Sequence, residues 1–209
     1  MWMSVIRARV FHQKIKQNKY AVPAVLVIWV LAVGIGWMAL SRYENIPGQA
    51  QASPEHWPDL SKIPSTAGLP TLLMFVHPHC PCSRASMNEL SLIMAHCQNK
   101  VRTQVVFVKP AEFTQDWIKT DLWNSAIHIP GVEAIVDNEG SEAKIFHADV
   151  SGQTMLYDGQ GNLVFSGGIT SSRGHEGDNE GRDAIVLFLT KGAVSRKQTP
   201  FFGCRLFNH

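Results

Sequence analysis

Two hydrophobic patterns divide this chain of 209 residues. Residues 21–40 contain no charged side chain. As an α-helix, this stretch would be about 30 Å long, which matches the hydrocarbon thickness of a lipid bilayer. From about residue 67 onward, short apolar runs alternate with segments in which apolar side chains recur at helical spacing. The patterns therefore predict one membrane-spanning helix followed by one α/β domain.

The second pattern predicts the order of elements within the domain. The expected strands are residues 72–76, 104–108, 133–136, 153–157 and 162–166. The expected helices are residues 83–97, 112–127, 138–147 and 179–191, and residues 138–147 could also form a loop. Asp158, Gly159 and Gly161 stand between the last two strands and predict a hairpin turn. Because the first two strands are joined by a helix, we expect them to be parallel, in a mixed central sheet flanked by helices.

Two of the expected helices carry a wide apolar face, which we expect to pack against the sheet. In residues 83–97 the face consists of Met87, Leu90, Leu92, Ile93 and Met94. In residues 112–127 it consists of Phe113, Trp117, Ile118, Leu122 and Trp123.

Charges beside the long apolar stretch predict how it crosses the membrane. Five basic residues and no acidic residue precede it: Arg7, Arg9, Lys14, Lys16 and Lys19. Because positive flanks stay in the cytoplasm, we expect residues 1–20 to be cytoplasmic and the remainder to lie on the periplasmic side. Ala50-Gln51-Ala52 resembles a signal-peptidase site, but it lies ten residues beyond the apolar run. That run also exceeds the usual ~7–15 residues of a cleavable signal, so residues 21–40 are predicted to be an uncleaved anchor in the inner (plasma) membrane.

Residues 41–66 are expected to form a linker, because their repeated prolines and small polar residues resist both helix and sheet. The domain then comprises residues 67–209, which is long enough to bury a core without disulfides. Whether Trp57 and Ile63 of the linker pack on the domain stays open.

The formal net charge of +2 arises from the segment that flanks the membrane. Of the 19 Lys and Arg residues, six precede Tyr43, which leaves 13 basic against 17 acidic side chains from there on. The domain is therefore slightly acidic, and this balance gives no support for binding of nucleic acid.

The run His77-Pro78-His79-Cys80-Pro81-Cys82-Ser83-Arg84 joins the first strand to the first helix. Free backbone N–H groups and the positive end of the helix dipole stabilise an anion at a helix start. A thiolate there has a lowered pKa and is nucleophilic near neutral pH. We predict that Cys80 and Cys82 form a redox pair, with Cys80 as the more exposed, attacking thiol and Cys82 as the resolving thiol. An inert surface disulfide is the alternative.

Other polar side chains could tune this pair or contact substrate. His77 and His79 flank the cysteines and could share a proton with a thiol, or could cap backbone groups. Arg84 opposes the helix dipole in the first turn, so it requires a compensating partner, either the thiolate or substrate, unless it is solvated. His175, in a glycine-rich loop, could be a base or a metal ligand, or could lie on a polar surface. Asp178 or Asn179 is expected to cap the last helix.

The remaining two cysteines leave three interpretations open. Cys97 ends the first helix, where a lone cysteine on a core face is commonly a buried free thiol. An even number of cysteines in an oxidising compartment also allows a Cys97–Cys204 disulfide. In the third interpretation, the tail folds over the redox pair and Cys204 takes part in its chemistry.

Five segments together form a specific combination within about residues 65–206. They are residues 77–86, 157–158, 163–170, 172–179 and 200–204. In these segments the chain resembles the RedB-type membrane-anchored thioredoxin-like proteins. The resemblance implies a thioredoxin-like fold and a thiol–disulfide role, with no defined substrate.

The chain departs from ordinary thioredoxins at two points. Its cysteines are spaced C-x-C instead of C-x-x-C. Gln153 stands where thioredoxins have a cis-proline that shapes the peptide-binding groove. The resemblance therefore places Gln153 among the candidate residues for substrate contact.

Two functional hypotheses follow, and a third keeps the cysteines structural, in an anchored assembly factor. The first is a membrane-anchored periplasmic thiol–disulfide oxidoreductase, which acts on protein thiols or a redox partner protein and needs only its own disulfide as cofactor. The second is a copper-binding, metallochaperone-type protein. Its metal ligands would be Cys80, Cys82, His79 and His175, because thiolates beside imidazoles suit copper.

Overall fold

The computed structural model describes residues 2–65 and 68–207. The chain forms two compact units, which divide between Tyr43 and Glu44. Helix α1 (Trp2–Asn45) accounts for the first unit as far as Tyr43 and ends two residues later. Its portion Tyr20–Asn45 has a mean hydropathy of 2.3, so the described residues contain one helix long and apolar enough to cross a membrane. The expected boundary between linker and domain, at residues 66 and 67, lies outside the described residues.

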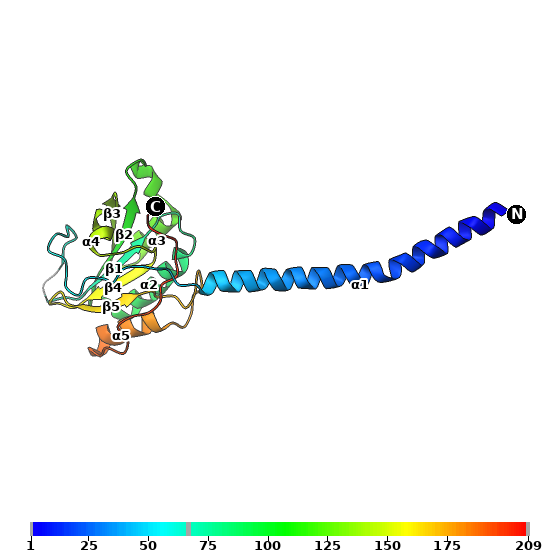
Figure 1. Ribbon diagram of the computed structural model, residues 1–209. Coiled ribbons are helices and arrows are strands. Elements are labelled where there is room, and N and C mark those ends of the chain that lie inside the picture. The colour runs from blue at the N-terminus through cyan, green and yellow to red at the C-terminus, as the bar shows by residue number, and fades with distance from the viewer. Residues whose placement is uncertain (1, 66–67, 208–209) are drawn as a thin grey trace. The chain divides into compact units, whose positions relative to one another are not determined.

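The second unit is built on a five-stranded sheet with the order β3-β2-β1-β4-β5 (Figure 1). The strands are β1 (Thr71–Val76), β2 (Arg102–Lys109), β3 (Val132–Asn138), β4 (Gln153–Tyr157) and β5 (Leu163–Gly167). Strand β1 is central and pairs in parallel with β2, which pairs in parallel with β3. Strand β4 pairs antiparallel with both β1 and β5. The predicted mixed sheet and the parallel crossover are confirmed.

Helices cover both faces of the sheet. They are α2 (Ser83–Cys97), the 3-10 helix η1 (Gln115–Ile118), α3 (Asp121–His128), α4 (Ser141–Ile145) and α5 (Glu180–Lys191). Helix α2 has the predicted bounds. Helix α5 begins after Asn179, whose side chain accepts a hydrogen bond from the Arg182 backbone N–H at 2.7 Å, and ends at Gly192 with φ 68°. Asn179 is therefore the cap of α5.

The single helix expected at residues 112–127 is wrong, because two shorter helices occupy this region. Thr120 has extended φ and ψ of −99° and 177° and interrupts the helical path after η1. Its side chain then accepts a hydrogen bond from the Trp123 N–H and caps α3. The threonine is a good helix cap and a poor residue for a helix interior, which explains the break.

Two apolar clusters lie on opposite faces of the sheet. Leu72 and Met74 of β1 join side chains of α2, α3 and α5 in one cluster. Leu73 and Phe75 join α4 and the segments around it in the other. Because both faces of β1 are buried, its sequence is a continuous apolar run instead of an alternating one. On α2 the expected core face is correct except for Leu92, which is 43% exposed.

The proline-rich segment before β1 packs on the second cluster. The Trp57 ring lies 5.2 Å from the rings of Phe146 and Tyr157, measured between centroids. The Tyr157 hydroxyl donates a hydrogen bond to the Pro54 carbonyl at 3.0 Å, and Ile63 is buried. Trp57 and Ile63 of the predicted linker therefore both pack on the domain. Together these elements form a thioredoxin-like α/β fold.

Candidate active site

Cys80 lies in the tight connection between β1 and α2. Its backbone N–H donates to the His77 carbonyl at 3.0 Å, and its carbonyl accepts from the Ser83 N–H at 3.2 Å. Cys82 is the N-cap residue of α2, so both sulfurs lie at the start of this helix. Cys80 is only 1% exposed and Cys82 is half-buried. The expectation that Cys80 would be the more exposed thiol is therefore wrong.

Four hydrogen-bond donors surround the Cys80 sulfur. The Cys204 Sγ lies 2.8 Å away, and the Cys204 backbone N–H also points at Cys80 Sγ, with the nitrogen at 3.4 Å. The hydroxyls of Ser83 and Ser151 are the other donors. The Cys204 thiol has the largest effect, and together the donors outweigh burial and lower the pKa of Cys80 to about 4. Cys80 is therefore a thiolate at neutral pH.

Three thiols share this site and hold one negative charge. The sulfurs of Cys80, Cys82 and Cys204 all lie within 4.8 Å of one another. Burial and then the Cys80 charge raise the pKa of Cys82. The hydrogen bond to Cys80 and then burial raise the pKa of Cys204. Because a second thiolate would be repelled by the first, Cys82 and Cys204 are protonated beside the Cys80 thiolate.

Ser151 links the end of β1, the start of α2 and the tail at this site, and the sequence analysis missed it. Its hydroxyl accepts from the His77 backbone N–H at 2.8 Å and lies 2.7 Å from the Ser83 hydroxyl. Its own backbone N–H donates to the Cys204 carbonyl at 2.8 Å. A polar residue just before β4 was the available signal, since β4 runs antiparallel to β1 and starts beside the end that carries the cysteines.

Arg173 is the second residue that the sequence analysis missed. Its guanidinium donates to the Gly203 carbonyl, and to the Ile46 carbonyl at 3.3 Å. Its positive charge opposes the raised pKa of both Cys82 and Cys204. It therefore lies close to the sulfurs of Cys82 and Cys204, and it holds the backbone of Gly203, the residue before Cys204.

Arg84, by contrast, forms an ion pair with Asp121 at the start of α3. The Nε to Oδ2 distance is 2.6 Å and both side chains are well exposed. Asp121 is the compensating partner that an arginine in the first helical turn requires. The cation that approaches the thiols is Arg173 and not Arg84.

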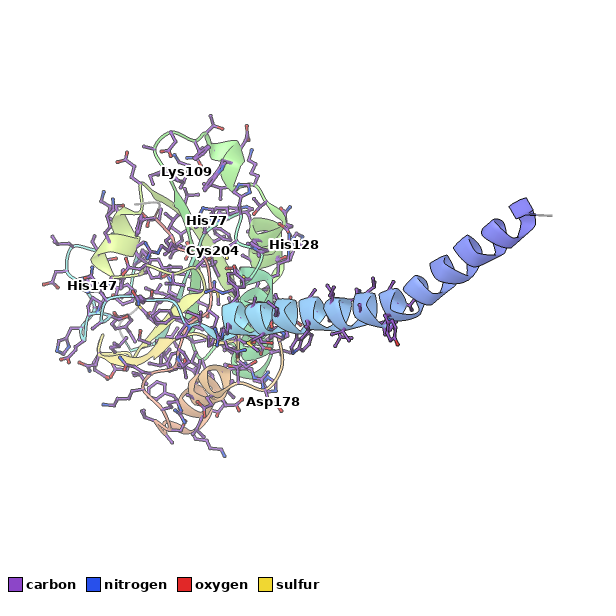
Figure 2. The ribbon with its side chains drawn as sticks, turned by 45° about the vertical axis from the view of Figure 1, so that its right-hand side comes forward. His77, Lys109, His128, His147, Asp178 and Cys204 are labelled. Carbon is purple, nitrogen blue, oxygen red and sulfur yellow. The ribbon has the colours of Figure 1, made fainter. Side chains whose placement is uncertain are left out.

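The two flanking histidines belong to an aromatic group beside the thiols. The Trp117 ring lies 5.3 Å from His77 and 4.7 Å from His79, between centroids, and it stacks on Phe113 at 4.7 Å. His79 Nε2 also lies 3.0 Å from the Trp117 carbonyl. Burial lowers the pKa of His77, which favours the neutral ring. Figure 2 shows His77 near Cys204, consistent with their shared partner Ser151.

His175 and Gln153 lie outside the sulfur cluster. His175 is exposed, and its Nδ1 lies 3.0 Å from the Arg173 carbonyl. The Gln153 side chain accepts from the Asp149 N–H at 3.1 Å and donates to the His147 carbonyl at 3.3 Å. It therefore holds the turn before β4, and the described residues contain no cis peptide bond.

Cys97 lies in the core at the other end of α2. It is fully buried, and burial raises its pKa. It lies fifteen positions after Cys82, which corresponds to about 22 Å along the helix axis. Cys204 lies beside Cys80, so the tail is folded over Cys80 and is not positioned for a Cys97–Cys204 disulfide.

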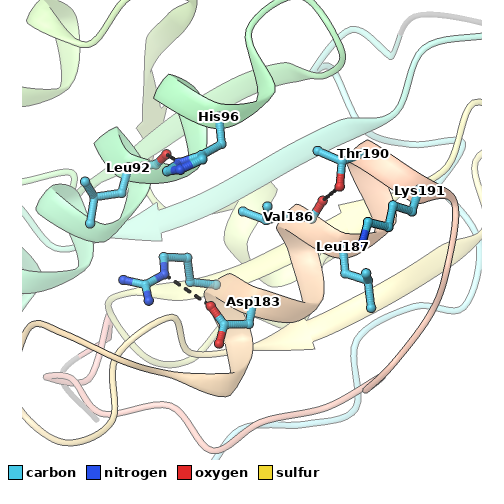
Figure 3. Close-up of a pocket in the computed structure, with 8 residues that line it drawn as sticks. Leu92, His96, Asp183, Val186, Leu187, Thr190 and Lys191 are labelled. Carbon is cyan, nitrogen blue, oxygen red and sulfur yellow. Dashed lines mark hydrogen bonds and ion pairs between the residues drawn. The ribbon is translucent and has the colours of Figure 1, made fainter.

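A groove between α2 and α5 lies away from this chemistry (Figure 3). It has a volume of about 460 Å³ and is lined by residues such as Leu92, His96, Val186 and Thr190. No cysteine lines it, and Leu92 is ten residues beyond Cys82, about 15 Å along the helix. The groove is separate from the site of the thiols.

Comparisons with known proteins agree with the fold. No protein-family model and no curated protein matches the chain. A hypothetical protein from Sinorhizobium meliloti is similar in structure, with a TM-score of 0.58, 17% identity, and coverage of 76% of this chain and 96% of that one. An uncharacterized conserved protein from Geobacillus kaustophilus has a TM-score of 0.55, 19% identity, and coverage of 78% and 93%. A secreted Mycobacterium tuberculosis disulfide oxidoreductase is less similar, with a TM-score of 0.42, 14% identity, and coverage of 59% and 81%.

Proposed function

We propose that this chain is a membrane-anchored thiol–disulfide oxidoreductase of the RedB type, with Cys80 as its nucleophile. The observation that carries the proposal is the environment of Cys80, which stabilises a thiolate at neutral pH and places two further thiols within 4.8 Å. A structural cysteine needs neither feature, since buried thiols in apolar surroundings have raised pKa values, as Cys97 does.

The chemistry begins with the Cys80 thiolate, which attacks one sulfur of a substrate disulfide. The substrate S–S bond breaks, the departing sulfur leaves as a thiolate and takes up a proton, and Cys80 is joined to substrate in a mixed disulfide. A second thiol of the site then attacks Cys80 Sγ and releases the other substrate thiol. The substrate disulfide gains two electrons, and two thiols of this chain become a disulfide.

The surroundings of the site favour a protein substrate or a redox partner protein. Phe113, which is 41% exposed, extends the aromatic group of Trp117, His77 and His79 onto the surface. Exposed aromatic side chains are typical of surfaces that contact other proteins. The proposed chemistry needs no cofactor beyond the cysteines, and the basic residues before the apolar helix support a periplasmic domain.

The test uses the full chain in a mild detergent, equilibrated in a series of glutathione buffers. Free thiols are alkylated, counted and mapped by mass spectrometry at each potential. We expect one reversible two-electron couple that includes Cys80, absent in Cys80→Ser and retained in Cys97→Ser. A wild-type chain whose Cys80 stays reduced in every buffer would overturn the proposed function.

A second candidate function is binding of a soft metal ion, and the proximity of three sulfurs favours it. The cluster that could hold an ion consists of Cys80, Cys82 and Cys204, and it includes neither His79 nor His175 of the ligand set predicted from the sequence. Thiolates select Cu(I), so titration with Cu(I) against a competing chelator tests this candidate. Binding of one ion that is lost in Cys204→Ser would support it. Binding that survives this substitution would contradict the three-sulfur site.

A further inference from the structure

The chain's last described segment lies across the start of α2. We call residues 198–206 the C-terminal strap. The Phe201 carbonyl accepts from the Gly48 N–H, the Cys204 carbonyl from the Ser151 N–H, and the Leu206 N–H donates to the Asp149 carbonyl, each at 2.8 Å. Phe202 and Leu206 are buried. The strap therefore follows one course, fixed by backbone hydrogen bonds and apolar anchors.

Gly203 allows the strap to approach Ser151 closely. A Cβ atom at residue 203 would overlap the Ser151 carbonyl oxygen. Because only glycine lacks that atom, residue 203 permits the contact that brings Cys204 to the site. The Arg173 guanidinium, bonded to the Gly203 carbonyl, fixes the same point from the other side.

The strap encloses the nucleophile. Cys80 is 1% exposed while Cys204 supplies both its Sγ and its backbone N–H to the Cys80 sulfur. No external disulfide can reach the Cys80 sulfur while Cys204 covers it. The strap must therefore move before Cys80 can react with substrate. After reaction, its return brings a thiol directly to Cys80.

We propose that Cys204 is the resolving thiol for Cys80 and that the C-terminal strap opens to admit a substrate disulfide and closes to release the product. The inference rests on the proposed function and names the second thiol of that reaction. In place of the Cys80–Cys82 pair expected from the C-x-C motif, the internal disulfide joins Cys80 to Cys204.

In the mixed disulfide, Cys80 Sγ is bonded to a substrate sulfur. The Cys204 thiol loses its proton and attacks Cys80 Sγ, the bond from Cys80 to substrate breaks, and the substrate sulfur leaves and is protonated. Cys80 and Cys204 are now a disulfide, and the substrate disulfide has become two thiols. An external dithiol partner returns two electrons and two protons to complete the cycle.

The charges of the site support the timing of this step. The Cys80 thiolate is the main reason that the pKa of Cys204 is raised in the closed, reduced site. Once Cys80 is part of a mixed disulfide its negative charge is gone, so that contribution disappears while the positive charge of Arg173 remains. Cys204 thus becomes easier to ionise at the stage when it must attack.

The first experiment identifies the resolving thiol in the full chain in mild detergent. The protein is oxidised with glutathione disulfide, trapped in acid and mapped for disulfides. We expect a Cys80–Cys204 disulfide in the wild type and in Cys82→Ser, and a persistent Cys80–glutathione mixed disulfide in Cys204→Ser. A Cys80–Cys82 disulfide in the wild type, unchanged in Cys204→Ser, would overturn the inference and leave the proposed function intact. Failure of Cys80 to form any disulfide would instead overturn the proposed function.

The second experiment tests the strap. Gly203→Ala should hold the strap open, so alkylation of reduced Cys80 by iodoacetamide should become about tenfold faster, as expected for loss of one or two backbone hydrogen bonds. Thr199→Val is a milder variant, since it removes only a 2.7 Å hydrogen bond to the Gly168 carbonyl. Gly36→Ala, whose added Cβ meets no atom within 4 Å, is the matched control. Unchanged alkylation rates in both strap variants would overturn the proposal that the strap controls access to Cys80.

Discussion

The charge of the site depends on one sulfur. Cys80, Cys82 and Cys204 lie within 4.8 Å of one another, and only Cys80 has a lowered pKa. A thiolate inside the domain is stable only where donors replace the water it loses. Serine hydroxyls, a thiol and a backbone N–H perform this role at Cys80. The fully reduced site therefore carries a single negative charge at Cys80, which supports this residue as the proposed nucleophile.

An acid titration of the reduced protein checks this assignment. Thiolate absorbs in the ultraviolet and thiol does not, so absorbance should fall as the pH drops through about 4, the pKa of Cys80. Above that pH the absorbance should stay level into the alkaline range, because the pKa values of the other three cysteines are raised. Cys80→Ser should lack the acidic step. A wild-type chain whose first step lies near the ordinary thiol value of 9.0 would contradict the assignment.

Ser151 should act on the same titration. In Ser151→Ala the Cys80 thiolate loses one donor, which raises the pKa of Cys80, so the acidic step moves to higher pH. A hydrogen bond to a charged group contributes about 1.5 kcal/mol or more, which corresponds to at least about a tenfold change in the acid dissociation constant. Ser91→Ala is the matched control, because the Ser91 hydroxyl bonds the Asn88 carbonyl on the exposed side of α2. If the acidic step lies at the same pH in both variants, Ser151 does not stabilise the Cys80 thiolate.

At the scale of elements, α2 is held against α5 by an ion pair between Glu89 and Arg182. Arg182 Nη1 lies 2.7 Å from Glu89 Oε2, with Glu89 1% and Arg182 18% exposed. Glu89 Oε1 also accepts from the Gly177 N–H at 2.7 Å, which ties the loop that follows Arg173 to α2. Glu89 therefore holds the loop that carries Arg173 against α2, the helix that has the cysteines at its start. The contact should affect the position of Arg173 as well as the stability of the domain.

Glu89→Ala should be strongly destabilising. It leaves the Gly177 N–H without its acceptor and removes the shortest ion pair of Arg182, which keeps only Asp178 and Asp183 at 3.5 and 3.4 Å. The expected cost is about 3 kcal/mol, toward the lower end of the range for a broken buried pair. Chemical denaturation of the full chain in detergent measures the loss in free energy of unfolding. Glu176→Gln changes an exposed side chain of the same loop, bonded to Asn88, and should unfold close to wild type. Equal stability of both variants would show that the buried pair does not hold α2.

Most elements could be predicted from the sequence because local patterns and burial agree. Each of these patterns fits one type of element: the apolar runs of β1 and β2 fit strands, the periodicity of α2 fits a helix, and the glycines after Asp158 fit a hairpin turn. The helix at residues 112–127 was mispredicted, since its apolar spacing continued through Thr120 although that residue caps a new helix. Periodicity reports which side chains are buried, and it does not register such an interruption.

The local part of the candidate site could be predicted from the sequence, since Cys80 and Cys82 follow from a strand–cysteine–helix motif. For the distant Cys204, a tail folded over these cysteines was one of three open interpretations. Ser151 and Arg173 reach the cysteines through the pairing of β4 with β1 and through the loop before α5, and neither contact is encoded by spacing. The burial of Cys80 likewise depends on the strap, which is 124 residues away in sequence at Cys204.

At the scale of the whole molecule, the proposed chemistry requires that the domain face an oxidising compartment. Dithiols cycle with external disulfides where the cytosolic reductants are absent. The portion Tyr20–Asn45 of α1 is long and apolar enough to anchor the chain. Its orientation is therefore the property that connects the anchor to the function.

Protease digestion of sealed, inside-out membrane vesicles tests that orientation. The domain should be protected, because the five basic residues before the apolar stretch hold their end on the cytoplasmic face and send the domain into the vesicle lumen. Replacing Arg7, Arg9, Lys14, Lys16 and Lys19 by Gln removes that bias, so a fraction of the chains should become digestible. Arg42→Gln is the matched control, since it removes a charge from the other flank and should leave the domain protected. Complete digestion of the wild-type domain would place the three thiols in the cytoplasm, where thiol-reducing systems would keep them reduced and the proposed oxidoreductase would lack its compartment.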